Sequence, residues 1–304
     1  MVEQWGIRVP SKSGEEVRKS LMGDGVLDLS LKVIRDGSTL VLPVTEQREG
    51  AERCSFELRA GRPVLPRHEL VGGIAIMQEN DPAGAEQILA TIASLHTVLC
   101  PASDVMGEYR TRKFEVLAGI PTTRTEILEY GHRFVIDLAS AYFSSRLSSE
   151  RQRILGKVGD RELILDMFAG VGPFAITLAK RAALVIACDI NPRAVILMQE
   201  NLGKNRVKNV LPVLADAHHL PGTLLLKFDR IIMNLPLSGT AFLADAFRLC
   251  KSGGIIHFYS LVAQEGQHRD DLDDMGGEVI DERVVRSYSP GQWHVVYDVK
   301  VATR

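Results

Sequence analysis

Cysteines, long apolar runs and charge of one sign are scarce in this sequence, and each scarcity excludes a class of protein. The four cysteines among 304 residues, Cys54, Cys100, Cys188 and Cys250, include no Cys-x-x-Cys pair, and the eight histidines show no metal-ligand spacing. We therefore expect no metal site and no disulfide framework, and we interpret the histidines, including the pair at 218 and 219, as structural or surface groups. No run of about 18 apolar residues predicts a membrane span, and the first residues lack a basic, apolar leader, so we expect a cytoplasmic protein with no membrane contact.

The net charge of −2 argues against a strongly basic nucleic-acid-binding protein, although charge can be concentrated locally. Between residues 107 and 161, Lys and Arg exceed Asp and Glu by three. A solvated surface of mixed charge explains that excess about as well as a track for phosphates does. Charge alone is therefore weak support for an RNA partner.

The length of the chain allows two or three domains, and the pattern of turns and apolar runs predicts three. Residues 1–48 are expected to form a small α+β domain, with a strand at 5–10, a helix at 13–21 and a hairpin of strands 27–34 and 40–44 about Asp36-Gly37. Residues 45–62 are polar and predict a linker. A middle α+β domain, 49–123, is expected to hold a strand near 73–78, a helix near 83–95 and a strand near 98.

Residues 124–304 predict a doubly wound α/β domain, because short apolar strands alternate with helical stretches. Two further strands, 278–284 and 293–301, would close this mostly parallel sheet, the last of them antiparallel at its edge. The expected alternating strands are 134–138, 163–166, 185–189, 210–214, 230–233 and 254–259.

A nucleotide-binding turn is the most informative feature of this third segment. The apolar strand 163–166 runs into Gly170 and Gly172, whose lack of a Cβ lets the backbone approach a ligand, and a helix begins at about Phe174. Asp189 ends the next strand, 17 positions after Gly172, where a carboxylate would meet a ribose. Alone, this pattern also fits a dinucleotide enzyme. Two details argue against that alternative. Pro173 stands where the rest of a G-x-G-x-x-G motif would continue, and Asp166, at the end of the strand before the turn, would repel a pyrophosphate.

Three acids, Asp166, Asp189 and Asp216, each stand at or just past the C-terminal end of a predicted parallel strand. The carboxyl ends of such strands meet at one edge of the sheet, so we expect an acidic rim there. S-adenosylmethionine fits such a rim, with its amino group and sulfonium near Asp166, its ribose at Asp189 and its adenine amino group near Asp216. The alternative is that the acids only cap the helices that follow them.

The expected strand 230–233 leads into Asn234-Leu235-Pro236, and the proline stiffens the loop. This turn resembles the Asn-x-Pro element of methyltransferases that act on nitrogens of nucleobases. The asparagine can accept a hydrogen bond from an amino group and hold a ring nitrogen toward the methyl donor. The simpler interpretation is a turn that only ends the strand.

Five segments together resemble the tRNA (guanine-37-N1)-methyltransferase family of archaeal and eukaryotic type. They are Tyr109–Gly119, Ala141–Arg151, Asp166–Phe174, Asp189–Pro192 and Asn234–Pro236. The resemblance extends over essentially the whole chain. It implies a Rossmann-like class I methyltransferase domain preceded by small α+β domains, with S-adenosylmethionine as cofactor. The implied partner is tRNA, bound at its anticodon loop and outer corner, with the first domain recognising the shape of the tRNA and the protein acting as a monomer.

The resemblance also implies roles for single residues. Glu150 would be the general base, Arg110 would steady charge on guanine O6, and Asn234 with Pro236 would clamp the base. Methylation of guanine N1 requires the same kinds of group. Because N1 carries a proton, a carboxylate must accept it, and because negative charge grows on O6 when that proton leaves, a cation must offset the charge. The implied cofactor-binding residues are Tyr142, Arg146, Asp166, Phe168, Gly170, Gly172, Asp189, Ile190, Asp216 and Asn234.

Each of these residues also has a simpler interpretation. Glu150 can form a surface ion pair with Arg151 or Arg153, Arg110 can contact a phosphate, and Tyr142 can pack in the core. Three other functions stay open at this point. They are transfer of the aminocarboxypropyl group of the same cofactor, methylation of a wyosine intermediate at the same tRNA position, and a catalytically silent tRNA-binding protein.

Overall fold

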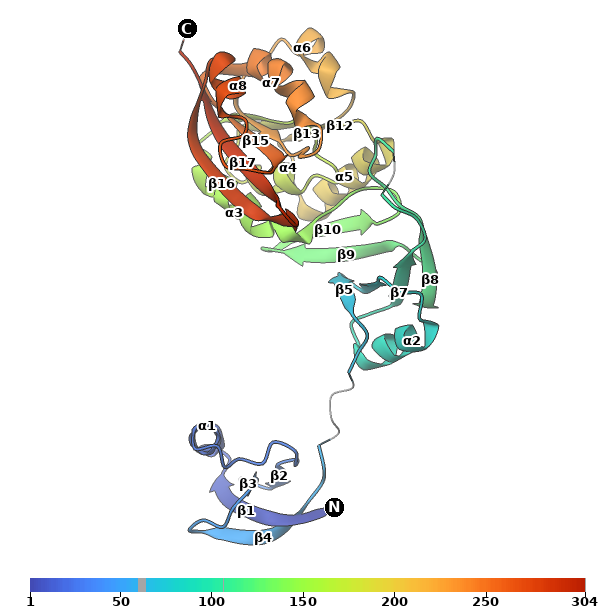
Figure 1. Cartoon of the computed structure of the whole chain (residues 1–304), viewed down its shortest axis with the longest axis vertical. Coiled ribbons are helices and arrows are strands. Elements are labelled where there is room, and N and C mark those ends of the chain that lie inside the picture. Colours follow the sequence, from blue (N-terminus) through green and yellow to red (C-terminus); the bar gives the residue numbers. More distant parts are fainter. Residues whose placement is uncertain (60–63, 106, 304) are drawn as a thin grey trace. The chain divides into compact units, whose positions relative to one another are not determined.

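The computed structural model describes residues 1–59, 64–105 and 107–303, and the chain forms two compact units, Met1–Val64 and Leu65–Arg304 (Figure 1). The first unit holds one sheet and the second holds three. Within the described residues, no helix is long and apolar enough to cross a membrane.

The first unit is an antiparallel sheet with one helix packed on it. Its elements are β1 (Val2–Pro10), α1 (Gly14–Gly23), β2 (Ile34–Asp36), β3 (Thr39–Val44) and β4 (Ala51–Phe56), and the strand order is β2-β3-β1-β4. The predicted hairpin turn at Asp36-Gly37 is confirmed. The predicted strand at 27–34 is wrong for most of its length, because Asp28 accepts a hydrogen bond from the Ser30 N–H at 3.0 Å and turns the chain there.

The stretch from 45 to 62, predicted to be a linker, contains β4, which pairs with β1. It is polar because β4 is an edge strand: Glu52 and Arg53 are exposed, while Phe56 is fully buried. The first unit therefore extends past residue 48, where the sequence predicted its end. Residues 60–62 of the predicted linker lie outside the described residues.

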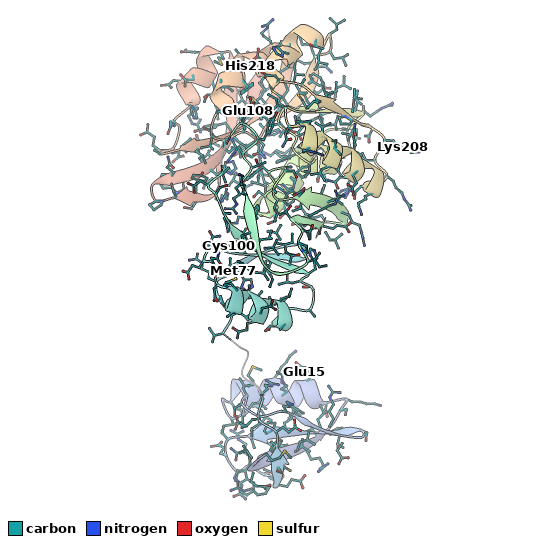
Figure 2. The ribbon with its side chains drawn as sticks, turned by 90° about the vertical axis from the view of Figure 1, so that its right-hand side faces the viewer. Glu15, Met77, Cys100, Glu108, Lys208 and His218 are labelled. Atoms are coloured by element: carbon teal, nitrogen blue, oxygen red, sulfur yellow. The ribbon has the colours of Figure 1, made fainter. Side chains whose placement is uncertain are left out.

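The second unit begins with a mixed sheet of order β5-β6-β7-β8. Its elements are β5 (His68–Val71), β6 (Ile74–Met77), α2 (Pro82–Thr91), β7 (Thr97–Pro101) and β8 (Phe114–Gly119), so the predicted strands near 73–78 and 98 are present and the predicted helix ends earlier, at Thr91. The helix begins where the Asp81 side chain accepts from the Gly84 N–H at 2.9 Å. Met77 and Cys100, labelled in Figure 2, are buried side chains of β6 and β7.

The middle sheet shares a core with the rest of the second unit. Ile74, Ile76 and Leu99 are buried in the same cluster as Phe134 and Ile164. The boundary expected between residues 123 and 124 therefore does not separate two cores.

β9 (Arg124–Glu129) and β10 (His132–Asp137) form a separate antiparallel pair, so the prediction that residues 134–138 belong to the doubly wound sheet is wrong. The reason lies in α5 (Pro192–Asn205). The Asn201 side chain accepts from the Val135 N–H at 2.7 Å and donates to the Val135 carbonyl at 3.0 Å, which occupies backbone groups of β10. Asn201 also donates to the Val171 carbonyl at 3.0 Å, so the same side chain anchors the glycine turn.

The doubly wound sheet has the strand order β13-β12-β11-β14-β15-β17-β16. Its members are β11 (Leu163–Asp166), β12 (Leu184–Asp189), β13 (Val210–Leu214), β14 (Phe228–Met233), β15 (Cys250–Val262), β16 (Gly277–Ser289) and β17 (Gln292–Val301). The first five are parallel, and β17 is antiparallel to both of its neighbours. The prediction that the last strand lies at the edge of the sheet is wrong. Residues 294–299 of β17 are all buried, so β17 takes an inner position, and the half-exposed β16 forms the edge.

Helices cover both faces of this sheet, which confirms the doubly wound architecture. The helices are η1 (Ser145–Leu147), α3 (Ser148–Lys157), α4 (Pro173–Leu178), η2 (Ala217–His219), α6 (Leu220–Thr223), η3 (Gly239–Phe242), α7 (Leu243–Leu249) and α8 (Arg269–Asp274). Ile164, Val185 and Ile232 point to one face, with α3, α4 and α5, and Leu165, Ile186 and Ile231 point to the other, with α6, α7 and α8.

Candidate active site

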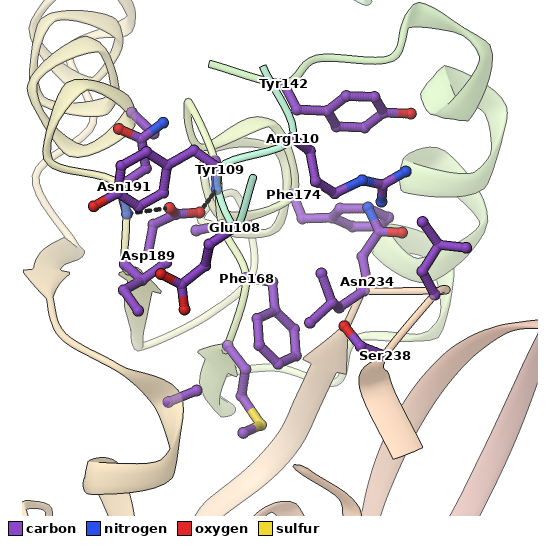
Figure 3. Close-up of a pocket in the computed structure, with 18 of the residues that line it drawn as sticks. Glu108, Tyr109, Arg110, Tyr142, Phe168, Phe174, Asp189, Asn191, Asn234 and Ser238 are labelled. Atoms are coloured by element: carbon purple, nitrogen blue, oxygen red, sulfur yellow. Dashed lines mark hydrogen bonds between the residues drawn. The ribbon is translucent and has the colours of Figure 1, made fainter. Parts of the chain in front are cut away.

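A cavity of about 490 Å³ opens at the carboxyl edge of the seven-stranded sheet (Figure 3). The loops that follow β11, β12, β13 and β14 line it, together with parts of segments 107–110 and 142–151. Ligands bind at this edge in doubly wound sheets. Of the predicted site residues, Arg110, Tyr142, Phe168, Gly170, Asp189, Ile190, Asp216 and Asn234 line the cavity, whereas Arg146, Glu150, Asp166, Gly172 and Pro236 do not.

The two glycines of the turn have different tasks. Both have positive φ, 56° at Gly170 and 87° at Gly172, which favours glycine. Gly170 lines the cavity and its N–H donates to Asp189 Oδ2 at 2.7 Å. Gly172 begins α4, and a Cβ there would lie 2.8 Å from Cγ of Met198, so it is needed for packing on α5 and not for contact with a ligand.

Asp189 both holds the turn and faces the cavity. Its second oxygen, Oδ1, accepts from the Asn191 N–H at 2.8 Å. Burial raises the pKa of Asp189, and the N–H groups of Asn191 and Gly170 offset part of that rise. Each oxygen keeps a second lone pair, which is able to accept a hydrogen bond from a ligand hydroxyl.

Asp166 does not face the cavity, so the prediction of a rim of three acids is wrong for this residue. Its side chain is 1% exposed, and neither carboxylate oxygen has a hydrogen-bond partner among the described residues. Burial raises the pKa of Asp166 to about 7, and the charge of Asp189 adds to the rise. The N–H groups of Phe168 and Ala175 lower the pKa only in part, because neither reaches hydrogen-bonding geometry.

One end of the cavity is flat and aromatic. Phe168 meets Phe242 edge-on with ring centroids 5.0 Å apart, and His218 stacks on Phe242 at 3.9 Å. Asp216 caps η2, as the alternative interpretation of the acids held, because it accepts from the His218 N–H at 2.9 Å, yet it also lines the cavity. His218 is therefore more than a surface group. This end suits a heteroaromatic ring.

The other end gathers Arg110, Tyr142, Phe174 and Asn234 (Figure 3). The guanidinium carbon of Arg110 lies 4.9 Å from the centroid of the Tyr142 ring. Tyr142 is 43% exposed, so the interpretation of this residue as core packing is wrong. Arg110 has φ of 53°, which is uncommon for a residue with a side chain and recurs at functional sites.

The loop that carries Asn234 is fixed by its backbone. The Leu235 carbonyl accepts from the Gly239 N–H at 2.7 Å, and the Pro236 carbonyl accepts from the Leu261 N–H at 3.0 Å. Asn234 lines the cavity, whereas Pro236 does not and lines a neighbouring hollow instead. Pro236 therefore stiffens the loop and is not in a position to clamp a base in the cavity.

Glu150 lies one layer behind the cavity wall. It is 6% exposed, it forms a fork of hydrogen bonds with Arg153 at 2.7 to 2.9 Å, and Oε1 accepts from the Tyr259 hydroxyl at 2.7 Å. The ring of Tyr259 packs on Phe174, a lining residue, at 5.9 Å. The ion pair expected in the simpler interpretation exists, but it is buried and not on the surface.

Arg151 is a lining residue that the sequence analysis did not include in the site. It is 1% exposed and donates from Nε to Glu129 Oε1 at 2.7 Å. Its guanidinium lies beside the rings of Phe143 and Phe174. No sequence signal marks the ion pair of Arg151 and Glu129, since the two residues belong to different elements. Other lining residues outside the prediction include Glu108, Tyr109, Asn191, His218, Ser238 and Phe242.

Two family models match this sequence. The TRM5/TYW2 methyltransferase domain matches residues 125–274, and the tRNA methyltransferase 5 N-terminal domain matches residues 6–52. The second match covers most of the first unit.

Individual proteins match over nearly the whole length. The tRNA (guanine(37)-N(1))-methyltransferase Trm5b of Pyrococcus abyssi is 37% identical over 97% of this chain and 98% of its own, and its wild-type crystal structure gives a TM-score of 0.80. The structure of a complex of aTrm5 with tRNALeu gives a TM-score of 0.79 at 28% identity, and the match covers 97% of this chain and 99% of that one. Methanocaldococcus jannaschii TYW2 in complex with AdoMet gives 0.61 at 29% identity and covers 78% of this chain and 100% of that one.

Proposed function

The chain belongs to the TRM5/TYW2 methyltransferase family, and from that premise we propose that it transfers a methyl group from S-adenosylmethionine to N1 of guanosine 37 in tRNA. The observation that carries the proposal is a single cavity with two unlike ends. An aromatic end beside Asp189 and Asp216 adjoins an end that holds Arg110, Tyr142 and Asn234.

The residues of the first end fit the cofactor. Asp189 would accept hydrogen bonds from the ribose hydroxyls, Phe168, Ile190 and Phe242 would contact the adenine, and Asp216 would accept from its amino group. The buried, unpartnered carboxylate of Asp166 lies next in sequence to the turn and favours a cationic ligand there. When bound, S-adenosylmethionine supplies a methyl group on a sulfonium.

The residues of the second end fit a guanine whose N1 must lose a proton. Arg110 would offset the charge that develops on O6, and Asn234 would orient the base through hydrogen bonds from a fixed loop. Tyr142 offers an exposed ring for stacking.

We assign the base to Glu150, whose carboxylate accepts a fork of hydrogen bonds from Arg153. In the structure Glu150 is engaged by Arg153 and Tyr259 behind the cavity wall. The proposal therefore requires the side chains between Glu150 and the cavity to move aside when tRNA binds, while Arg153 and Tyr259 continue to hold the carboxylate.

Methyl transfer is favoured over aminocarboxypropyl transfer and over a silent binding role. The N-terminal domain of tRNA methyltransferase 5 matches this chain, whereas the TYW2 structure covers only 78% of it. Asn234-Leu235-Pro236 also favours methylation over aminocarboxypropyl transfer. Phe168, Asp189 and Asn234 all line one open cavity, which argues against a silent binding protein.

The test uses the full chain, unmodified tRNA with guanosine at position 37, and S-adenosylmethionine labelled either on the methyl group or on the aminocarboxypropyl chain. We expect methyl label in tRNA, and nucleoside mass spectrometry that finds 1-methylguanosine. A tRNA with adenosine at position 37 is the control and should stay unlabelled. Label from the aminocarboxypropyl chain, or tight tRNA binding without any transfer, would reject the proposal.

Three further parts of the proposal follow from a tRNA substrate. The first unit would recognise the outer corner of the tRNA, because its family match is to the N-terminal domain of tRNA methyltransferase 5. One copy of the chain carries every lining residue of the cavity, so we propose that a monomer is active. We also place the activity in the cytoplasm.

A further inference from the structure

A second hollow, of about 220 Å³, adjoins the active-site cavity. The two share Arg110, Tyr142, Phe143 and Ser144 as lining residues, so they lie on either side of the same wall. Arg146, which the sequence analysis assigned to the cofactor, lines this second hollow instead. The hollow is therefore a separate feature with its own chemistry.

Four arginines converge on this hollow from separate parts of the second unit. Arg110 and Arg112 precede β8, Arg146 lies in η1, and Arg286 lies on β16. Among the described residues that line the hollow, the one carboxylate is Glu69, which pairs with Arg146 at 3.1 Å. The hollow thus carries an excess of positive charge, and such an excess is unfavourable unless an anion is present.

Three of the four arginines are held beside aromatic rings, and the guanidinium carbon of Arg286 lies 5.8 Å from the centroid of Tyr288. The guanidinium carbon of Arg112 lies 5.1 Å from the centroid of Phe114, and that of Arg110 lies 4.9 Å from Tyr142. Nε of Arg110 and Nε of Arg286 are buried and have no hydrogen-bond partner within the described part of the chain. Restrained guanidinium groups with free N–H donors match the oxygens of a phosphate.

The positive field of the hollow reaches its neighbour on β17. His294 pairs with Arg286 across the two strands. Burial lowers the pKa of His294 to about 4, and the charge of Arg286 is the next cause. His294 is consequently neutral at physiological pH and does not add a fifth cation. The charge available to a ligand comes from the arginines alone.

We propose that this hollow binds a phosphodiester group of the tRNA backbone next to the guanosine that enters the active-site cavity. The inference rests on the proposed function, because tRNA brings the phosphate. Because the two hollows share Arg110 and Tyr142, they are adjacent. A guanine in one hollow and the phosphate next to it in the other would then be separated by a single nucleotide step. Arg112 and Arg286 would then fix the position of the RNA without reading its sequence.

The first experiment measures tRNA binding by Arg286→Gln and Arg112→Gln as a function of salt. Each change should weaken tRNA binding about tenfold and lower the slope of log K against log salt by about one, because one phosphate contact is lost. S-adenosylmethionine should bind as it does to the parent chain. Arg286→Lys should restore the salt slope because it keeps the charge, and this also excludes misfolding as the cause. Arg248→Gln, at an exposed arginine on α7 that lines neither hollow, is the matched control.

The second experiment locates the phosphate. Full-length tRNA carrying one neutral methylphosphonate linkage, on the 5′ or the 3′ side of guanosine 37, should bind the parent chain more weakly for one of the two linkages. That linkage should make no further difference to Arg286→Gln. A free-phosphate site would instead show micromolar binding of inorganic phosphate and no such coupling. That result, or an unchanged salt slope, would overturn the inference. A parent chain that binds tRNA with this coupling but does not methylate it would reject only the proposed function.

Discussion

Two groups of acidic side chains in the second unit are built in opposite ways. Asp166 and Asp189, at the carboxyl edge of the sheet, are neighbouring acids with no cationic side chain hydrogen-bonded to either one in the described structure. Glu150 and Asp298, on α3 and β17, are acids that are fully paired with cations. This difference indicates where a cationic ligand would bind, because only the first of these two groups has no cationic side chain hydrogen-bonded to it in the described structure.

The paired group is a network around Asp298. Its carboxylate accepts from Arg153 at 2.7 Å, from Lys157 at 2.6 Å and from His257 Nδ1 at 2.6 Å. Arg230 donates to His257 Nε2, so the ring is neutral with its proton on Nδ1. Burial alone would raise the pKa of Asp298, but hydrogen bonds from His257 and Arg153 lower the pKa far below its usual range. The network holds Glu150 in place through Arg153.

Glu150→Gln is expected to have the largest effect of the changes that test the difference between the two groups. If the paired network serves catalysis, this change should lower the rate of methylation by about 10²–10⁴-fold, because an amide does not accept the N1 proton. The affinity for S-adenosylmethionine should stay within about twofold. Single-turnover methylation and isothermal titration measure the two quantities.

Glu162→Gln is the matched control for that change. Glu162 is another carboxylate of the same buried region, paired with Arg230 at 2.7 Å, and it does not line the cavity. Its substitution should cost stability and leave the rate nearly unchanged. Equal losses of rate in both variants would mean that Glu150 acts only through the fold.

Asp298→Asn tests whether the network is as strongly paired as its contacts indicate. We expect the free energy of unfolding to fall by about 3–5 kcal/mol, because Arg153 and Lys157 lose a shared counter-charge. The pKa of Asp298 is depressed in the folded chain, so its contribution is complete above the unfolded pKa near 3.8 and is lost only as the pH falls below it. Urea unfolding should therefore show a constant gap between variant and parent from pH 8 to pH 5. A gap that closes between pH 7 and pH 5 would contradict this account.

The same contrast explains how far the sequence leads. The glycine turn, Asp189 and Asn234 are predictable, because short βα loops put them at one edge of a parallel sheet. The burial of Asp166 is not, since a strand-ending acid looks the same whether it faces the cavity or the core. The pairing of Arg153 with Asp298 depends on the position of β17 in the strand order, and the sequence predicted this strand at the edge of the sheet. Local patterns thus located the cavity, and long-range pairing decided which acids face it.

Asp166→Asn addresses the unpaired group. The folded pKa of Asp166, about 7, exceeds the unfolded value near 3.8, so the parent chain loses stability as the pH rises through that window and stays penalised above it. The uncharged variant should be more stable than the parent by about 2–4 kcal/mol at pH 8 and nearly equal to it at pH 4. Its affinity for S-adenosylmethionine should fall. Urea unfolding without cofactor, with the exposed Asp270→Asn as control, decides the matter; a destabilised variant at pH 8 would refute it.

Tyr259→Phe is the finest test, because it removes one hydrogen bond from the paired group and leaves every charge in place. The hydroxyl donates to Glu150 Oε1 at 2.7 Å, and Arg153 still holds the same oxygen after the change. We expect a loss of about 1–2 kcal/mol in unfolding free energy and a methylation rate lowered about fivefold with KM for tRNA unchanged, since Tyr259 positions the base and does not touch the substrate. Tyr297→Phe is the control, because the Tyr297 hydroxyl is buried without a hydrogen-bond partner in the described structure, and its removal should not destabilise the chain. If the two variants lose rate equally, the hydrogen bond to Glu150 has no part in catalysis, and the paired group would be a structural element alone.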